Sequence, residues 1–139
     1  MPFTDCPVFI VRLYFENRAG GVYADPAGFA RLVYKPGPRA EGALLTHSRH
    51  LLARHHGRML VDQRLMQPYS PVEQQLVRQE WLPLAIEENG YRYGAVVQAQ
   101  DVFARLATAT VLTQARNSKM TYRYFDDEAA ATAWLLSCA

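Results

Sequence analysis

Residues 59–73, MLVDQRLMQPYSPVE, decide the fold of this chain. The wholly apolar run Met59–Val61 is typical of a short strand that is covered on both faces. Ser70 then stands at an N-cap position, with Pro71 at the first helical position and Glu73 at the third, which is a capping box with a favoured proline. A buried strand that leads into a capped helix predicts a unit of an α/β sheet.

Three β-like runs precede this unit. Residues 8–15 are rich in β-branched and aromatic side chains, a short run follows at 22–24, and a third covers 29–35. Turns at Asn17–Gly21 and Asp25–Gly28 separate them, and the second turn carries Pro and Gly where tight turns use them. The pattern predicts an antiparallel meander.

One helix is predicted before the strand Met59–Val61 in the chain, and another after it. Residues 40–56 show helical spacing and Gly57 is a reasonable stop. In the helix that starts after Ser70, Pro83 predicts a kink or an early end because it lacks a backbone donor. The first helix is predicted to bury Leu44, Ser48, Leu51, Leu52 and His55. The second is predicted to bury Val72, Leu76, Val77, Trp81 and Leu84.

Two more helix–strand units complete the chain. A strand is predicted over 91–99, a helix capped by Asp101, a strand over 122–125, and a last helix capped by Asp126 or Asp127. The inner stripe of the third helix is predicted to be Phe103, Leu106, Ala107, Thr110 and Val111. That of the last helix is predicted to be Ala130, Ala131, Trp134, Leu135 and Cys138.

The order of these segments predicts the fold class. Strands that are separated by helices should lie parallel, through right-handed crossovers. We therefore predict a single α/β domain over residues 1–139. It has a mixed five- to six-stranded sheet with an N-terminal antiparallel meander, followed by alternating helix–strand units, with about four helices.

Composition and charge argue against several classes of protein. The 139 residues fit one domain; half are apolar and a fifth are charged, which is ordinary globular usage. An excess of two basic residues is too small and too scattered for a nucleic-acid binder. No apolar stretch approaches the ~20 residues of a membrane span, and the first residues lack a signal-peptide pattern. We expect a cytoplasmic protein.

The sequence contains no recognisable catalytic or metal-binding set. Neither Ser48 nor Ser70 lies in a Gly-x-Ser-x-Gly elbow. Cys6 and Cys138 have no CxxC spacing, and the intracellular character of the chain disfavours a disulfide between them. Four histidines crowd one predicted helix without further ligands at matching spacing, and they are His47, His50, His55 and His56. The sequence therefore predicts a non-enzymatic protein without cofactor or metal.

One group of polar residues follows the ends of the central strands. Ligands in open α/β sheets gather at the carboxyl edge, which makes a small polar site or a partner-docking face possible. The competing interpretation is structural: Asp62 pairs with Arg64, and Ser70 is only a cap. The candidate residues are Asp62, Gln63, Arg64, Tyr69, Ser70, Gln98 and Gln100.

The chain resembles the STAS/SpoIIAA-like superfamily, including its bacterial STAS–SEC14 type members. The resemblance lies in the order of elements over roughly residues 8–137. It also lies in Leu60-Val-Asp62 before a loop and a capped helix, and in the closing run FDDEAAATAWL of residues 125–135. Its motifs are largely architectural.

The resemblance implies a regulatory or protein-interaction domain. Anti-sigma-factor antagonists of that superfamily bind a partner kinase and are switched by phosphorylation of a Ser or Thr just after the strand-end Asp. Here the run Asp62-Gln-Arg-Leu65 carries no hydroxyl, which puts a phosphorylation switch in doubt. The alternative is a domain that binds a small or lipid-like ligand at the same edge. The partner and the oligomeric state, a homodimer included, stay open.

Overall fold

The computed structural model describes residues 10–37, 42–115 and 118–138, which contain a six-stranded mixed sheet whose spatial order follows the chain. The first three strands pair antiparallel, and the third to the sixth pair parallel. The strands are β1 Arg12–Glu16, β2 Gly20–Asp25, β3 Phe29–Tyr34, β4 Arg58–Asp62, β5 Tyr93–Val97 and β6 Thr121–Phe125. The predicted mixed sheet with an N-terminal meander is therefore confirmed.

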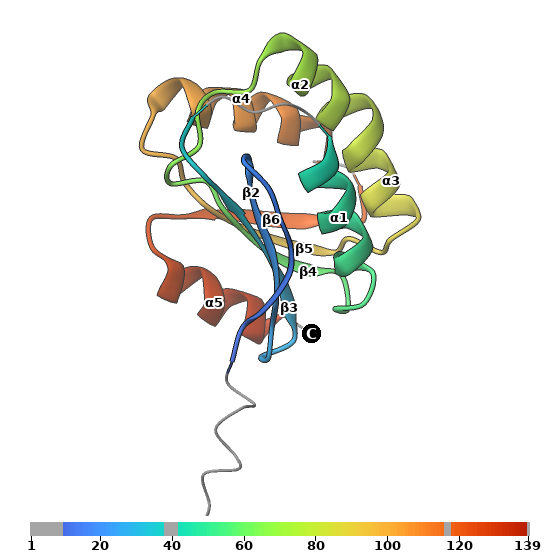
Figure 1. Ribbon diagram of the computed structural model, residues 1–139. Helices are drawn as coiled ribbons and strands as arrows, with labels where there is room; N and C mark the ends of the chain where they lie inside the picture. The colour runs from blue at the N-terminus through green and yellow to red at the C-terminus, as the bar shows by residue number, and fades with distance from the viewer. Residues whose placement is uncertain (1–9, 38–41, 116–117, 139) are drawn as a thin grey trace, which may run out of the picture.

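Helices connect the parallel strands and close the chain. They are α1 Ala43–Leu52, α2 Pro71–Leu76, the π-helical turn η2 Val77–Trp81, α3 Leu82–Glu87, α4 Val102–Leu112, the 3₁₀ turn η3 Thr113–Ala115 and α5 Glu128–Ser137. Figure 1 shows α1 to α4 on one side of the sheet and α5 on the other. Helices thus pack on both faces, as predicted.

Alternating strand residues divide between two cores. Leu32 and Val61 belong to the larger core, which fills the space between the sheet and the helices α1 to α4. Phe29 and Leu60 point the other way and pack with Leu135 of α5. This period of two is the geometry of any strand, in which successive side chains leave opposite faces.

The bounds of the meander differ from the prediction. Of the predicted strand 8–15, residues 8 and 9 lie outside the described part, and β1 begins only at Arg12. The second strand is longer than 22–24, because Gly20 and Gly21 pair with Tyr34 and Val33. A bulge between Leu13 and Phe15 interrupts the pairing of β1 with β2.

The first helix is shorter than the predicted 40–56, of which residues 40 and 41 lie outside the described part. It ends at Leu52 and is followed by turns, in which His56 and Gly57 have φ of 59° and 71°. Consecutive left-handed residues cannot continue a right-handed helix. His55 therefore lies in a turn, and its predicted place on the inner face of α1 is wrong.

The helix after Ser70 does not end at Pro83. It continues to Glu87, and a π-helical turn precedes the proline. The Leu82 N–H bonds to the carbonyl of Val77, five residues back. Such a wider turn is one way for a helix to accommodate a proline, whose ring conflicts with regular α-helical hydrogen bonding. Of the predicted inner residues of this helix, Val77 is buried but Val72 is exposed.

The outward faces of the last two long helices also differ from the prediction. In α4, Ala107 and Val111 are buried, but Phe103, Leu106 and Thr110 face outward. The residues buried instead are Ala104, Ala107, Thr108, Val111 and Leu112. In α5, Ala131 and Leu135 are buried as predicted and Ala130 is exposed. Both helices are apolar on more than one side, so spacing alone does not identify the inner stripe.

Two predicted N-caps are present. The Asp101 carboxylate accepts hydrogen bonds from the backbone N–H groups of Phe103 and Ala104. Asp127, rather than Asp126, accepts from the backbone N–H of Ala130. These bonds satisfy backbone donors that the first turn of a helix leaves unpaired, and they fix where α4 and α5 begin.

Candidate functional site

The carboxyl ends of β4 and β5 meet the start of α4 at one edge of the sheet. The Gln63 N–H donates to the carbonyl of Val97 at 3.0 Å, and the Gln100 N–H donates to the carbonyl of Arg64 at 3.1 Å. These bonds hold the loop after β4 against the segment that leads into α4. The predicted site residues therefore lie around one edge of the sheet, as their positions in the chain implied.

Asp62 and Arg64 form a bidentate pair. Nε of Arg64 lies 3.0 Å from Oδ1 of Asp62, and Nη2 lies 2.7 Å from Oδ2. The backbone N–H of Arg64 donates to the same carboxylate at 3.1 Å. The predicted structural pairing of these two residues is thus present.

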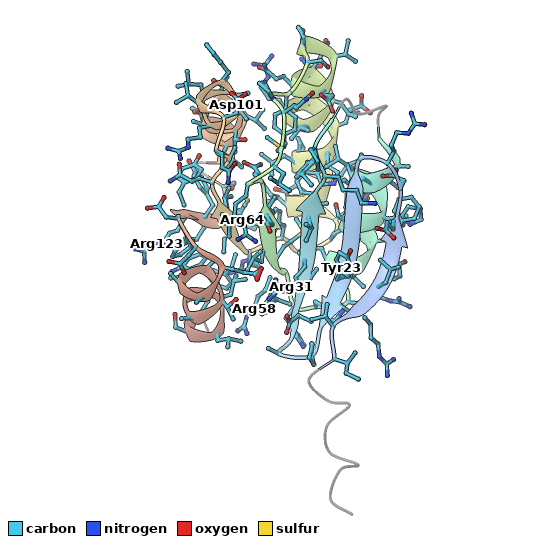
Figure 2. All side chains as sticks on the ribbon, turned by 60° about the vertical axis from the view of Figure 1, so that its left-hand side comes forward. Tyr23, Arg31, Arg58, Arg64, Asp101 and Arg123 are labelled. Atoms are coloured by element: carbon cyan, nitrogen blue, oxygen red, sulfur yellow. The ribbon has the colours of Figure 1, made fainter. Side chains whose placement is uncertain are left out.

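This pair belongs to a larger charge cluster beside α5. Nη1 of Arg31 in β3 lies 3.0 Å from Oε1 of Glu128, and its Nε lies 2.8 Å from Oδ2 of Asp25. Glu128 is also 3.7 Å from Nη2 of Arg64. Figure 2 shows Arg31 and Arg64 between α5 and the meander strands. Both guanidinium groups already meet carboxylates, so the cluster joins β3, β4 and α5 instead of presenting free charge.

The protonation of Asp62 reflects two opposing effects. Burial of the carboxyl group raises its pKa, whereas the hydrogen bonds and the positive charge of Arg64 lower it, with a smaller contribution from Arg31. The net effect is a pKa below the ordinary value of an aspartate. Asp62 is therefore an ionised partner in a salt bridge and is poorly suited to act as a general acid near neutral pH.

Gln63 and Tyr69 point to the opposite side of the sheet from Asp62. The Thr108 hydroxyl of α4 donates to Oε1 of Gln63 at 2.9 Å, and both residues are buried. The hydroxyl of Tyr69 lies 3.3 Å from that of Tyr34 in β3. These groups form a polar layer within the larger core.

A cavity of about 40 Å³ adjoins this polar layer. Val77 and Trp81 of the π-helical turn contribute to its wall, together with Tyr91 and the layer's own side chains. Burial, and then the proximity of Tyr69, raises the pKa of Tyr91. Pockets for organic ligands usually measure hundreds of cubic ångströms, whereas this volume suits about one water molecule.

The remaining candidates, Ser70, Gln98 and Gln100, do not line this cavity. Oγ of Ser70 accepts from the Glu73 N–H at 3.1 Å, and the Glu73 carboxylate accepts from the Ser70 N–H at 2.9 Å, which confirms the capping box. Nε2 of Gln98 donates to Asp126 at 3.3 Å. Gln100 is exposed. The seven candidates therefore share an edge but do not converge on one pocket.

Sequence reasoning missed an apolar surface at this edge. Val102, Phe103 and Leu106 at the start of α4 are 57%, 69% and 61% exposed. Ala109 and Thr110 of α4, and Thr113 at the start of η3, extend the same side and are also exposed. We call these six residues the α4 face. The available signal was that α4 carries apolar residues around most of its circumference, which exceeds what one buried stripe requires.

The polar side-chain groups of the α4 face are already hydrogen-bonded to the backbone. The hydroxyls of Thr110 and Thr113 donate to the carbonyls of Leu106 and Ala109, at 3.0 and 2.8 Å, so their hydrogen bonds are already made within the helix. Arg105, at its border, turns back and donates to the carbonyl of Ala99 at 2.6 Å. The face contains no charged side chain among its six residues.

Nowhere in the described ranges do three His, Cys, Asp or Glu side chains gather as a ligand set. Among those same residues, no helix has the length and apolar character that crossing a bilayer requires. Comparison of the chain with protein-family models, curated proteins and solved structures found no match.

Proposed function

We propose that this chain is a non-enzymatic protein-interaction domain of SpoIIAA-like type, which docks another protein chain through the α4 face. The observation that carries the proposal is the exposure of Val102, Phe103 and Leu106, each of which leaves more than half of its surface in water. A helix that is apolar on both its inner and outer sides is typically covered on both. An exposed apolar patch bordered by polar groups is typical of a protein–protein contact.

The binding mode is helix docking against an apolar surface. A ridge of large side chains on one helix fits a groove on a partner, and the α4 face supplies such a ridge at intervals of three and four residues. Aromatic side chains commonly provide the strongest contacts at such interfaces. Phe103, as the most exposed of the three large residues, is the expected anchor.

The polar residues at the same edge support a role without turnover. Asp62 is held by Arg64, Ser70 by its own capping box, and Gln63 by Thr108. These bonds account for the presence of each side chain structurally. The alternative of a small-ligand site has weaker support, since the nearby cavity has room for about one water molecule.

Differential capture tests the proposal. The tagged wild-type chain, Phe103→Glu and Leu136→Glu are compared for the proteins that each retains from an extract of the source cells. Leu136 is the matched control, since it is 49% exposed but lies on α5, on the other side of the sheet. A protein, including untagged copies of this chain, should be retained by the wild type and by Leu136→Glu and lost by Phe103→Glu. Equal retention by all three would contradict the proposal.

A further inference from the structure

The α4 face changes in size along the helix. Its first half carries the large side chains of Val102, Phe103 and Leu106. Its second half carries only the small side chains of Ala109, Thr110 and Thr113, whose hydroxyls are turned to the backbone. The face therefore has a raised end and a low end of similar length.

We propose that the occupant of this face is a second copy of the chain, with the two α4 helices packed antiparallel about a twofold axis. This inference rests on the proposed docking role of the α4 face. In an antiparallel pair, the raised end of each helix lies over the low end of the other, and Leu106 and Ala109 lie nearest the axis. Such an interface is isologous, so one self-complementary surface suffices to close the dimer.

Electrostatics are compatible with this arrangement. Because the α4 face has no charged side chain, the twofold axis brings no like charges together there. The antiparallel orientation also sets the positive end of each helix dipole beside the negative end of the other. Arg105, held by the Ala99 carbonyl, stays at the border.

The two outer strands of the sheet, β1 and β6, are less suitable for self-association by strand pairing. The outer strand β1 has a bulge between Leu13 and Phe15, and bulges are a common means of preventing edge-to-edge pairing. At the other edge, antiparallel pairing about the middle of β6 would place Arg123 opposite its own copy. Strand pairing at either outer strand is therefore a less suitable contact than the self-complementary α4 face.

The molecular mass of the purified full chain tests the proposal. Light scattering after gel filtration, over a concentration series, should give twice the 15.8 kDa of one chain for the wild type and for Leu136→Glu. Phe103→Glu should raise the dissociation constant by about 100-fold or more, because the dimer contains the substitution twice and each buries a charge in an apolar contact. A wild type that remains at 15.8 kDa at every concentration would overturn the inference.

Cross-linking tests the orientation of the helices. Val102→Cys and Thr113→Cys chains, each with Phe103 kept and with Cys6 and Cys138 changed to Ser, are mixed and treated with a short bismaleimide. Antiparallel helices bring position 102 of one copy near 113 of the other, so the mixed pair should dominate. Predominant 102–102 products would mean a parallel dimer and would overturn the arrangement proposed here.

The two proposals fail in different ways. A monomeric wild type that still loses a captured protein on Phe103→Glu leaves the docking role intact and excludes the second copy as its occupant. A dimer that forms equally well with Phe103→Glu excludes α4 as the contact. In that case the capture experiment decides separately whether the α4 face docks anything else.

Discussion

At the scale of single residues, consecutive side chains at the carboxyl end of β4 serve different faces of the sheet. Asp62 belongs to the charge cluster beside α5, and Gln63 bonds to Thr108 beneath α4. The carboxylate is stabilised in its ionised form by Arg64, whose side chain is 43% exposed. Solvent screening of that guanidinium limits the strength of the pair.

Replacing Asp62 with Asn should reduce stability in a pH-dependent way. The folded-state pKa of Asp62 is depressed, so its stabilising contribution is present above the unfolded pKa and is lost as the pH falls through the folded value. We expect Asp62→Asn to lose about 1 kcal/mol of unfolding free energy at neutral pH. Urea unfolding at pH values above and below the ordinary aspartate pKa of about 4 should show that the difference in unfolding free energy between the wild type and Asp62→Asn shrinks in acid. A difference that does not change with pH would contradict this assignment.

Two glycines with nearly the same positive φ should respond differently to alanine. Gly57 and Gly90 have φ of 71° and 70°. A Cβ at Gly57 would lie 1.9 Å from the carbonyl oxygen of Gly90, whereas a Cβ at Gly90 would meet nothing within 4 Å. We expect about 1 kcal/mol of destabilisation for Gly90→Ala and about 3 kcal/mol or more for Gly57→Ala. Equal shifts in thermal midpoint would mean that the close approach is not maintained in solution.

At the scale of elements, α2 depends on its first turn. It is only six residues long and leads directly into the π-helical turn. Ser70→Ala removes the acceptor for the Glu73 N–H, so we expect a loss of about 1 kcal/mol in urea unfolding. Ser70→Asp keeps an acceptor and should recover most of it. A loss of partner capture with unchanged stability would instead assign Ser70 to docking.

The two sides of α4 should differ sharply in their tolerance of truncation. Val111 is buried, and Val111→Ala should cost about 2 kcal/mol through lost burial and a small cavity. Phe103→Ala removes a larger side chain from the exposed face, yet it should change the stability of the monomer by no more than about 0.5 kcal/mol. Denaturation at concentrations low enough to dissociate any dimer measures both. A large loss for Phe103→Ala there would mean that Phe103 packs within its own chain.

The predictability of each element follows from how it is stabilised. The caps of α2, α4 and α5 were predictable because each depends on one side chain bonding to the next few backbone groups. The inner face of α4 was not, since Phe103 and Leu106 satisfy helical spacing as well as the buried residues do. The split of the candidate site was within reach of strand alternation, which sends Asp62 and Gln63 to opposite faces. The pairing of Asp62 with Arg64, two residues on, was also predictable, whereas the bond of Gln63 to Thr108, 45 residues away, required the tertiary structure.

At the scale of the whole molecule, the two faces of the sheet are covered unequally. Helices α1 to α4 cover one face, while α5 packs over β4, β5 and β6 on the other. Arg31 and Glu128 link that helix to β3, and Arg58 donates to the Cys138 carbonyl just after its end. The smaller core, which lies between the sheet and α5, is therefore covered by this one ten-residue helix.

Neighbouring leucines in α5 provide a test of this packing. Leu135 is fully buried and Leu136 is half exposed. Leu135→Ala should cost about 3 kcal/mol and increase the binding of a dye that reports exposed apolar surface. Leu136→Ala should stay within about 0.5 kcal/mol of the wild type. Similar effects of the two substitutions would mean that α5 is not seated on the sheet as described.

The agreement between strand order and chain order has a consequence for how the protein is made. Each strand from β2 to β6 pairs with the one translated just before it, so the sheet can grow in step with synthesis and needs no distant partner. Only the cover over the smaller core must wait, because α5 is translated after all six strands. Until then the nascent sheet exposes Phe29 and Leu60, and this interval is when a chaperone has most to protect.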